Sequence, residues 1–171
     1  MNFVSITSPD VNNGQGNRVT CWISGCKHKC EGCHNKWLQD YSKGKDLSMA
    51  KDKIYEELSH EYIKGITFSG GDPLCQDDDS LDELFHLIQD IKQEFPLKDI
   101  WIFSGFTLDE LRKNGNEHQL NILKECDYFV DGKFEKDKKD VQLAFRGSSN
   151  QVIWRVNGGN FEQVPDEYFR N

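Results

Sequence analysis

The sequence predicts an α/β fold, built as a partial, open β/α barrel. Five runs rich in β-branched and aromatic residues predict strands, and amphipathic runs between most of them predict helices. Strands that alternate with helices along a chain pair in parallel through right-handed crossovers. A closed eight-fold barrel usually needs about 250 residues, whereas this chain has 171. We therefore expect an open sheet within one domain over residues 1–171, because no repeat or low-complexity linker interrupts the pattern.

The elements follow one another in a regular order. Ser48 is expected to cap a helix over residues 49–60 that turns Met49 toward its apolar side. Ser80 is expected to open a strongly amphipathic helix that ends near Phe95 and Pro96. Two short helices are expected over residues 108–113 and 117–126, and a polar stretch over 134–149. The expected strands span residues 18–24, 63–69, 100–103, 128–130 and 151–156.

Composition and charge exclude several classes of function. A net charge of −8 argues against a nucleic-acid partner, since binding to phosphates needs a basic face. No run approaches the roughly 18 apolar residues of a membrane span, and the first residues lack the pattern of a signal peptide. Six cysteines without an export signal predict reduced thiols in the cytoplasm. Cys21, Cys75 and Cys126 are expected to be small, buried apolar side chains.

Three cysteines lie close together in a C-x3-C-x2-C run formed by Cys26, Cys30 and Cys33. Thiols on one short loop can converge on a single inorganic centre, and a cubane iron–sulfur cluster needs four ligands. A cluster held by three cysteines keeps one iron open for a substrate. The alternative is a structural zinc site in which His28 or His34 supplies the fourth ligand.

Polar and glycine-rich groups follow four of the expected strands. The cysteine run follows the first strand, and the other segments are residues 69–72, 104–107 and 131–133. Ligands of such folds bind beyond the carboxyl ends of the strands. We therefore expect the four segments to meet on one face, an arrangement that a zinc knuckle does not require.

Two of these segments suggest how a small molecule would be held. Gly70 and Gly71, which precede Asp72 and Pro73, let the backbone approach a ligand closely because no Cβ intrudes. Asp131 and Lys133 stand two residues apart and in an extended chain project to the same side. Together they match the two charges of an amino-acid zwitterion. A simple turn and a solvated surface pair are the structural alternatives.

These motifs resemble the radical S-adenosylmethionine superfamily and, more narrowly, the activating proteins of anaerobic (class III) ribonucleoside-triphosphate reductases. The cysteine run followed by Ser-Gly-Gly-Asp-Pro carries the first resemblance, and the Arg-Gly-Ser-Ser-Asn-Gln run at 146–151 carries the second. Further support comes from Asn-Gly-Gln-Gly-Asn-Arg at 13–18 and Asp-Gly-Lys-Phe at 131–134. Many superfamily members have an aromatic residue where this chain has Gly32, and glutamate where it has Asp72.

The resemblance implies a cofactor set and a reaction. Cys26, Cys30 and Cys33 would hold a 4Fe–4S cluster whose open iron binds S-adenosylmethionine. Reductive cleavage of that cofactor would give methionine and a 5′-deoxyadenosyl radical, which takes hydrogen from a glycine of the reductase's large catalytic subunit and leaves a glycyl radical there. The expected cofactor-binding residues are His34, Gly70, Gly71, Asp72, Ser104, Asp131 and Lys133.

The resemblance also implies partners and leaves alternatives. A flavodoxin-like electron donor is expected, because reductive cleavage of the cofactor requires a cluster potential at the low end of the iron–sulfur range. The 134–149 stretch is expected to contact the large subunit, since long connections are often binding loops. The alternatives are an activase of pyruvate formate-lyase type, a radical enzyme that acts on a small metabolite, and a zinc-binding module. The short length, the lack of an inserted ferredoxin-like cysteine set and the 146–151 run count against the first.

Overall fold

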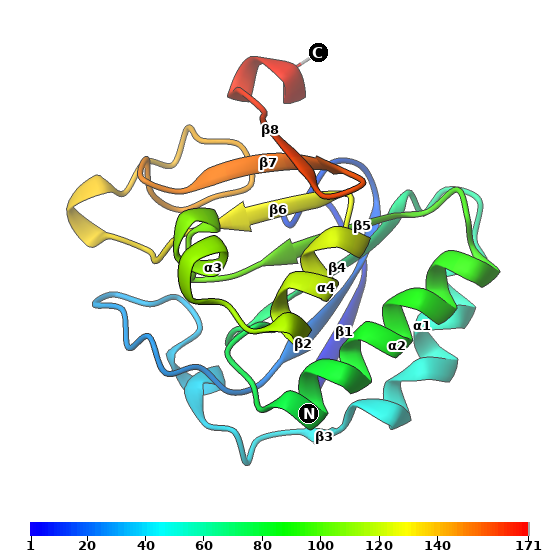
Figure 1. Cartoon of the computed structure of the whole chain (residues 1–171). Helices are drawn as coiled ribbons and strands as arrows, with labels where there is room; N and C mark the ends of the chain where they lie inside the picture. Colours follow the sequence, from blue (N-terminus) through cyan, green and yellow to red (C-terminus); the bar gives the residue numbers. More distant parts are fainter. Residues whose placement is uncertain (171) are drawn as a thin grey trace.

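A mixed sheet of eight strands runs through the centre of the molecule (Figure 1). The computed structural model describes residues 1–170. The strands are β1 (Asn2–Asp10), β2 (Arg18–Ile23), β3 (Lys45–Asp46), β4 (Gly65–Gly70), β5 (Asp99–Phe103), β6 (Tyr128–Asp131), β7 (Val152–Asn157) and β8 (Asn160–Gln163). The α-helices are α1 (Lys51–Leu58), α2 (Asp78–Glu94), α3 (Leu108–Asn114) and α4 (Glu117–Glu125). Short 3₁₀ turns form η1 (Lys36–Gln39), η2 (Leu47–Ala50), η3 (Lys136–Lys138) and η4 (Asp166–Phe169).

The centre of the sheet is parallel and both edges are antiparallel. The strand order is β3-β1-β2-β4-β5-β6-β7-β8, and β2, β4, β5 and β6 pair in parallel. At one edge β1 pairs antiparallel with β2 and β3, and at the other β7 pairs antiparallel with β6 and β8. The α/β class and the open sheet are thus confirmed.

The sequence prediction of five parallel strands was wrong at the edges. It missed β1, β3 and β8, and β7, the expected last strand, runs antiparallel to β6. In β1, exposed Ser5 and Thr7 flank the partly buried Ile6, the alternation of a half-covered strand. The β7–β8 hairpin turns at Gly158 and Gly159, whose positive φ angles of 56° and 84° suit a two-residue hairpin loop.

Both predicted serine caps were also wrong. Asp46 caps η2 by accepting a hydrogen bond from the backbone N–H of Ser48, so the α-helix begins only at Lys51 and Met49 is exposed. Asp77 likewise caps α2 by accepting from the N–H of Ser80. In each case an aspartate just upstream supplies the acceptor, and the serine N–H is the orphan donor that the cap satisfies.

Helices cover one face of the sheet. In Figure 1, α2 and α4 lie in front of the strands, and their buried side chains form one cluster with those of α1 and the sheet. In β5 the side chains alternate, so that Ile100 and Ile102 join this cluster and Trp101 faces the opposite side. This alternation divides the core between the two faces.

Loops and the C-terminal segment cover the opposite face. Trp101, Val130, Ile153 and Val164 form a small buried cluster there, flanked by Phe145 and other aromatic side chains. Beside it the buried Arg18 bonds to Thr67 Oγ1 at 2.8 Å and pairs with Asp99 at 2.6 Å, while Thr67 Oγ1 donates to the carbonyl of Asn13 at 2.6 Å. The loop of residues 11–17 is thereby tied across this face. Within residues 1–170, no helix combines the length and apolar character that crossing a membrane requires.

Candidate functional site

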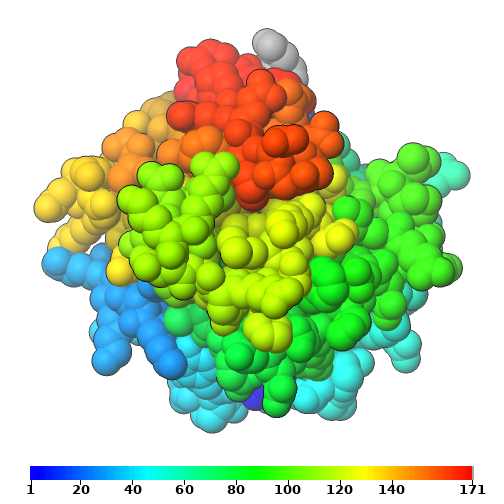
Figure 2. All heavy atoms as spheres, in the orientation of Figure 1, coloured from blue at the N-terminus to red at the C-terminus, as the bar shows by residue number. Residues whose placement is uncertain are grey.

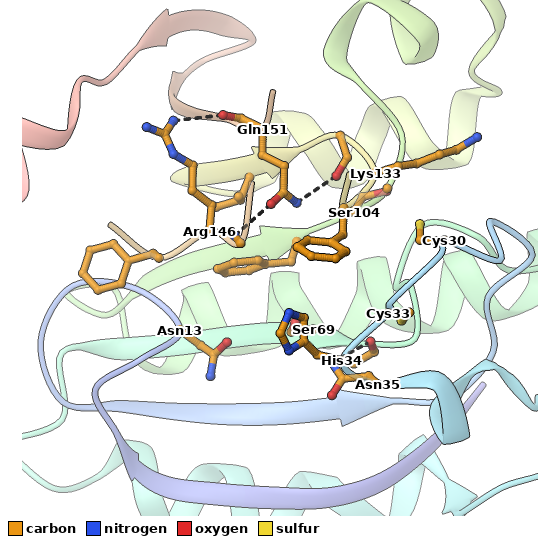
Figure 3. Close-up of a pocket in the computed structure, with 18 of the residues that line it drawn as sticks. Asn13, Cys30, Cys33, His34, Asn35, Ser69, Ser104, Lys133, Arg146 and Gln151 are labelled. Carbon is orange, nitrogen blue, oxygen red and sulfur yellow. Dashed lines mark hydrogen bonds between the residues drawn. The ribbon is translucent and has the colours of Figure 1, made fainter. Parts of the chain in front are cut away.

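A cavity of about 580 Å³ opens on the loop-covered face, beyond the carboxyl ends of the parallel strands. In Figure 2 the cysteine loop (residues 24–35, blue) and the loop of residues 134–149 (yellow to orange) protrude next to each other at the left edge. Figure 3 looks into the cavity, with Cys30 and Cys33 at one end, Asn13 at the other, and Arg146 and Gln151 above. The predicted site residues that line it are Cys26, Cys30, Cys33, His34, Gly70, Gly71, Ser104 and Lys133. The four strand-end segments therefore do meet on one face, as expected.

Backbone hydrogen bonds hold the cysteine loop in place. The N–H groups of Gly25 and Cys26 donate to the carbonyls of Leu38 and Gln39 at 2.7 and 3.1 Å, which folds η1 back under the loop. The side-chain amide of Gln76 donates to the carbonyls of Ser24, Gly25 and Asp72 at 3.0 to 3.3 Å. The start of the loop is thus fixed before any metal binds.

The two glycines after β4 let the cysteine loop and the strand end approach closely. Gly70 has a φ of +114°, and a Cβ there would lie 2.4 Å from the carbonyl oxygen of Ile23. A Cβ on Gly71 would lie 2.6 Å from the carbonyl oxygen of Gly25, to which Asp72 also donates its N–H at 2.9 Å. Any side chain at either position would push the loop off the strand.

Two of the three thiols, Cys26 and Cys30, are poor acids in the metal-free protein. Burial raises the pKa of Cys26 to about 12 and also raises the pKa of Cys30, where the nearby Lys133 ammonium opposes the shift. A thiolate ligand must lose its proton, and a bound cation supplies the charge that makes this favourable. Cys26 and Cys30 are therefore suited to a metal centre rather than to nucleophilic chemistry on their own.

His34 and Lys133 lie on opposite loops at the rim. The His34 ring packs edge-to-face on Phe134, with 5.0 Å between ring centroids, so the cysteine loop and the 134–149 loop touch across the opening. Lys133 is exposed, and Figure 3 shows its side chain reaching outward on the side of Cys30. Both side chains can therefore move toward a bound molecule.

Asp72 does not line the cavity, which corrects the prediction of a cofactor contact for its side chain. Its carboxylate is 1% exposed and accepts from the N–H of Leu74 at 2.8 Å, and from the hydroxyl of Ser104 and the N–H of Gly105 at 2.9 Å each. A fourth contact, 2.6 Å long, joins it to Nε2 of His28. All this bonding capacity is used within the protein, and Ser104, although it borders the cavity, donates its hydroxyl to Asp72.

Asp131 does not line the cavity either, so the predicted Asp131–Lys133 pair is not formed. Its buried carboxylate accepts from the N–H groups of Leu108 and Val152 at 2.8 and 3.1 Å and from the indole N–H of Trp154 at 2.9 Å. Burial nevertheless raises its pKa. The extended geometry that the prediction assumed ends at Gly132, whose φ is +95°.

Sequence reasoning missed one wall of the cavity, the 146–151 segment. Oε1 of Gln151 accepts from the N–H groups of Gly147 and Ser148 at 2.9 and 3.1 Å, and its Nε2 donates to the carbonyl of Gly132 at 2.9 Å (Figure 3). Arg146 donates to the carbonyl of Gln151 at 2.9 Å and pairs with Asp166 at 2.5 Å. The segment therefore folds the 134–149 loop onto the end of β6. The loop of residues 11–17 provides Asn12 and Asn13, which also line the cavity.

The three cysteines outside the cysteine run differ in burial. Cys21 and Cys126 are buried, as predicted. The prediction was wrong for Cys75, which is only half-buried and accepts from the N–H of Lys27 at 3.4 Å, directly beneath the cysteine loop.

The residues present fit a cluster with three protein ligands and a small organic cofactor. The three thiols reach one cavity from one loop, and the cavity volume is within the usual range of about 300–1,000 Å³ for ligand sites. The glycine edge at Gly70 and Gly71 borders the same space. The soft thiolate set matches an iron–sulfur centre.

Comparisons with known proteins agree with this donor set. A family model described as a 4Fe-4S single cluster domain matches residues 12–154. The chain is 40% identical over 158 residues to the anaerobic ribonucleoside-triphosphate reductase-activating protein of Pasteurella multocida, which covers 91% of this chain and 98% of the relative. The protein of the same name from Escherichia coli K12 is 41% identical over 156 residues, with 90% and 97% covered. That from Enterobacteria phage T4 is 38% identical over 160 residues, with 93% and 97% covered. The residues matched by the family model include every residue that lines the cavity except Val11.

Proposed function

Because the chain belongs to the family of anaerobic ribonucleoside-triphosphate reductase-activating proteins and matches the 4Fe-4S single cluster domain, we propose that it converts the large subunit of that reductase to its glycyl-radical form. One observation carries the chemical part of the proposal. The three cysteines of one loop line the same cavity as the glycine edge after β4. A redox centre and an organic cofactor would then share one cavity.

In this proposal Cys26, Cys30 and Cys33 hold a 4Fe–4S cluster, and S-adenosylmethionine occupies the rest of the cavity. The bound pair supplies the one-electron chemistry that removes a hydrogen atom from a glycine. The backbone at Gly70 and Gly71 and the side chains of His34 and Lys133 border the cofactor, and Ser104 orders that wall through its bond to Asp72.

The protein's own residues position the reactants and exclude water. Gln76 and the paired glycines fix the cysteine loop against β4, and the 146–151 segment holds the wall that faces it. We propose that the open sheet is the partial barrel of the radical S-adenosylmethionine type, and that residues 1–171 work as one domain. The partner's glycine segment lies across the face that carries the cysteine loop and residues 131–149, since hydrogen transfer needs near contact of the reacting atoms.

The exposed lysines at the rim of the cavity favour a negatively charged electron donor of flavodoxin type. The chain carries a net charge of −8, yet residues 27–36 and 133–140 together hold seven lysines against four carboxylates. These lysines are all exposed, and they are Lys27, Lys29, Lys36, Lys133, Lys136, Lys138 and Lys139. Complementary charge steers a donor toward the cluster and raises its association rate. A donor of this kind and six free thiols fit a cytoplasmic protein.

Anaerobic reconstitution tests the function. The protein loaded with iron and sulfide, a reductant and S-adenosylmethionine should produce an electron paramagnetic doublet on purified anaerobic ribonucleotide reductase, and Cys30→Ala should not. A doublet only on pyruvate formate-lyase would replace the proposal with the other activase. Cofactor cleavage with no protein partner would indicate a metabolite enzyme, and zinc without iron or acid-labile sulfide would indicate a zinc module.

Hydrogen exchange tests where the partner binds. We expect amides of the 134–149 loop to gain protection when the reductase is added, because this loop and the cysteine loop border the mouth of the cavity. Amides of α1, which lies on the helix-covered face, provide the internal reference. The absence of added protection anywhere in the loop would remove it from the interface.

A further inference from the structure

The cysteine loop contains a buried histidine that the proposed chemistry does not use. His28 lies between Cys26 and Cys30, and its side chain is only 7% exposed, although its neighbours Lys27 and Lys29 point into solvent. Burying a polar side chain costs free energy unless it is hydrogen-bonded, so a specific set of contacts must hold this ring inside.

The ring occupies a slot formed at the end of β5. The ring packs edge-to-face with Phe106, with 4.6 Å between the ring centroids. Gly105 leaves the necessary space, because a Cβ at that position would lie 2.5 Å from Cδ2 of His28. The end of β5 is therefore shaped to receive this imidazole.

Asp72 anchors the inner end of the ring. Its Oδ2 lies 2.6 Å from Nε2 of His28 and also accepts from Ser104 and Gly105. One carboxylate thus connects the loops that follow β2, β4 and β5. Hydrogen-bonded partners behind a ligand set fix its orientation, and their loss typically weakens metal binding about 10- to 100-fold.

The same atoms permit a second interpretation. One ligand atom each of Cys26, His28 and Asp72 lies within 4.8 Å of the others, so the group could hold a single metal ion. That arrangement would take Cys26 from the cluster and break the 2.6 Å contact between His28 and Asp72. The slot at Gly105 and Phe106 explains the buried ring without any ion.

We propose that His28 is a positioning residue for the iron–sulfur centre, held by Asp72 so that the backbone between Cys26 and Cys30 keeps its cluster-binding shape. The proposal rests on the proposed function only in assuming that these cysteines bind the cluster. The imidazole itself binds no iron, and Asp72 contributes a buried negative charge close to Cys26.

Four variants separate positioning from ligation. His28→Ala removes the anchor, and His28→Gln keeps a side-chain N–H that can reach Asp72 in the place of Nε2. Gly105→Ala displaces the ring and alters no potential ligand. His86→Gln is the matched control, because His86 lies exposed on α2.

The first readout is the rate at which reconstituted protein loses iron to a chelator, which needs no reductase. His28→Ala and Gly105→Ala should lose iron about 10- to 100-fold faster than the parent, whereas His28→Gln and His86→Gln should resemble it. Thermal unfolding of the metal-free proteins shows whether each variant folds, and Gly105→Ala keeps the test valid if His28→Ala does not.

The second readout is the midpoint potential of the cluster, which a purely structural role would leave unchanged. In the fraction of Asp72→Asn that retains the cluster, the midpoint potential should shift to a more positive value because a nearby negative charge is lost. Parent-like iron loss in both His28→Ala and Gly105→Ala would overturn the proposal, and so would a parent-like potential in Asp72→Asn. So would iron loss from His28→Gln as fast as from His28→Ala, since the imidazole would then be a ligand. A parent protein that holds iron but never activates the reductase would refute the function and leave this test intact.

Discussion

Gln151→Ala should release the 134–149 loop from the end of β6. The side chain accepts from two backbone N–H groups, those of Gly147 and Ser148, and donates to the carbonyl of Gly132. Each such bond contributes about 1 kcal/mol net, and an alanine supplies no replacement. Because water partly reaches this segment, the loss should be about 2–3 kcal/mol of local stability.

This magnitude converts directly into a measurable rate. A change of about 1.4 kcal/mol is a factor of ten in an equilibrium constant, so the local opening equilibrium should rise roughly 30- to 150-fold. Hydrogen exchange at the Gly147 and Ser148 amides reports that equilibrium, since these are the donors that lose their acceptor. Exchange in the helix-covered core should change little.

Gln142→Ala is the matched control, because Gln142 is exposed in the same loop and makes no side-chain hydrogen bond among the described residues. Affinity for S-adenosylmethionine should also fall in Gln151→Ala, since Phe145 and Arg146 on this loop line the cavity. Unchanged protection of both amides would refute the role assigned to Gln151.

Three further changes test other parts of the site. Replacing Cys26, Cys30 or Cys33 by alanine should abolish iron retention in an iron and sulfide assay. Alanine at Cys21, Cys75 or Cys126 should preserve it. Lys133→Ala should weaken S-adenosylmethionine binding about ten- to a hundred-fold by calorimetry, with normal cluster absorbance, through loss of a charge-assisted hydrogen bond; Asp131→Ala should instead lower the melting temperature, because three donors lose one buried acceptor. The hydrogen bond to Asp82 raises the pKa of His118, so the contribution of this pair to stability is complete below the ordinary histidine pKa and is lost as the pH rises through the raised value. His118→Gln should therefore remove that part of the pH dependence of denaturant unfolding. An unfolding profile with the same pH dependence as the parent would contradict this prediction.

The centre of the fold and the location of the site could be predicted from the sequence because both follow from local patterns. Dense β-branched runs mark β2, β4 and β5, and the glycine and cysteine motifs stand directly after them. The edges could not be predicted as easily. Strand β1 mixes serine and threonine with its apolar residues, and β3 has only two residues. Edge strands are half-covered, so their hydrophobic pattern is weak.

The carboxylates show a second limit of sequence reasoning. A motif reveals that Asp72 and Asp131 carry charge at strand ends, but it does not reveal which backbone N–H groups face them. The N–H of Leu74 comes from the same turn as Asp72, whereas those of Gly105, Leu108 and Val152 are brought in by the fold from distant parts of the chain. The role of Gln151 was hidden for the same reason, because its partners become apparent only once the loop is folded.

The two misassigned carboxylates help to explain the electrostatics of the cavity. Each is buried behind the cavity wall and satisfied by N–H donors, and Asp131 accepts from Leu108 at the first turn of α3, where a negative charge is favoured. Both carboxylates are thus bonded within the wall, and neither lines the cavity. The exposed charges around the mouth are then dominated by lysines, in a protein that is acidic as a whole. This basic rim favours anionic groups, such as the carboxylate of the methionine group that we propose to bind at the glycine edge.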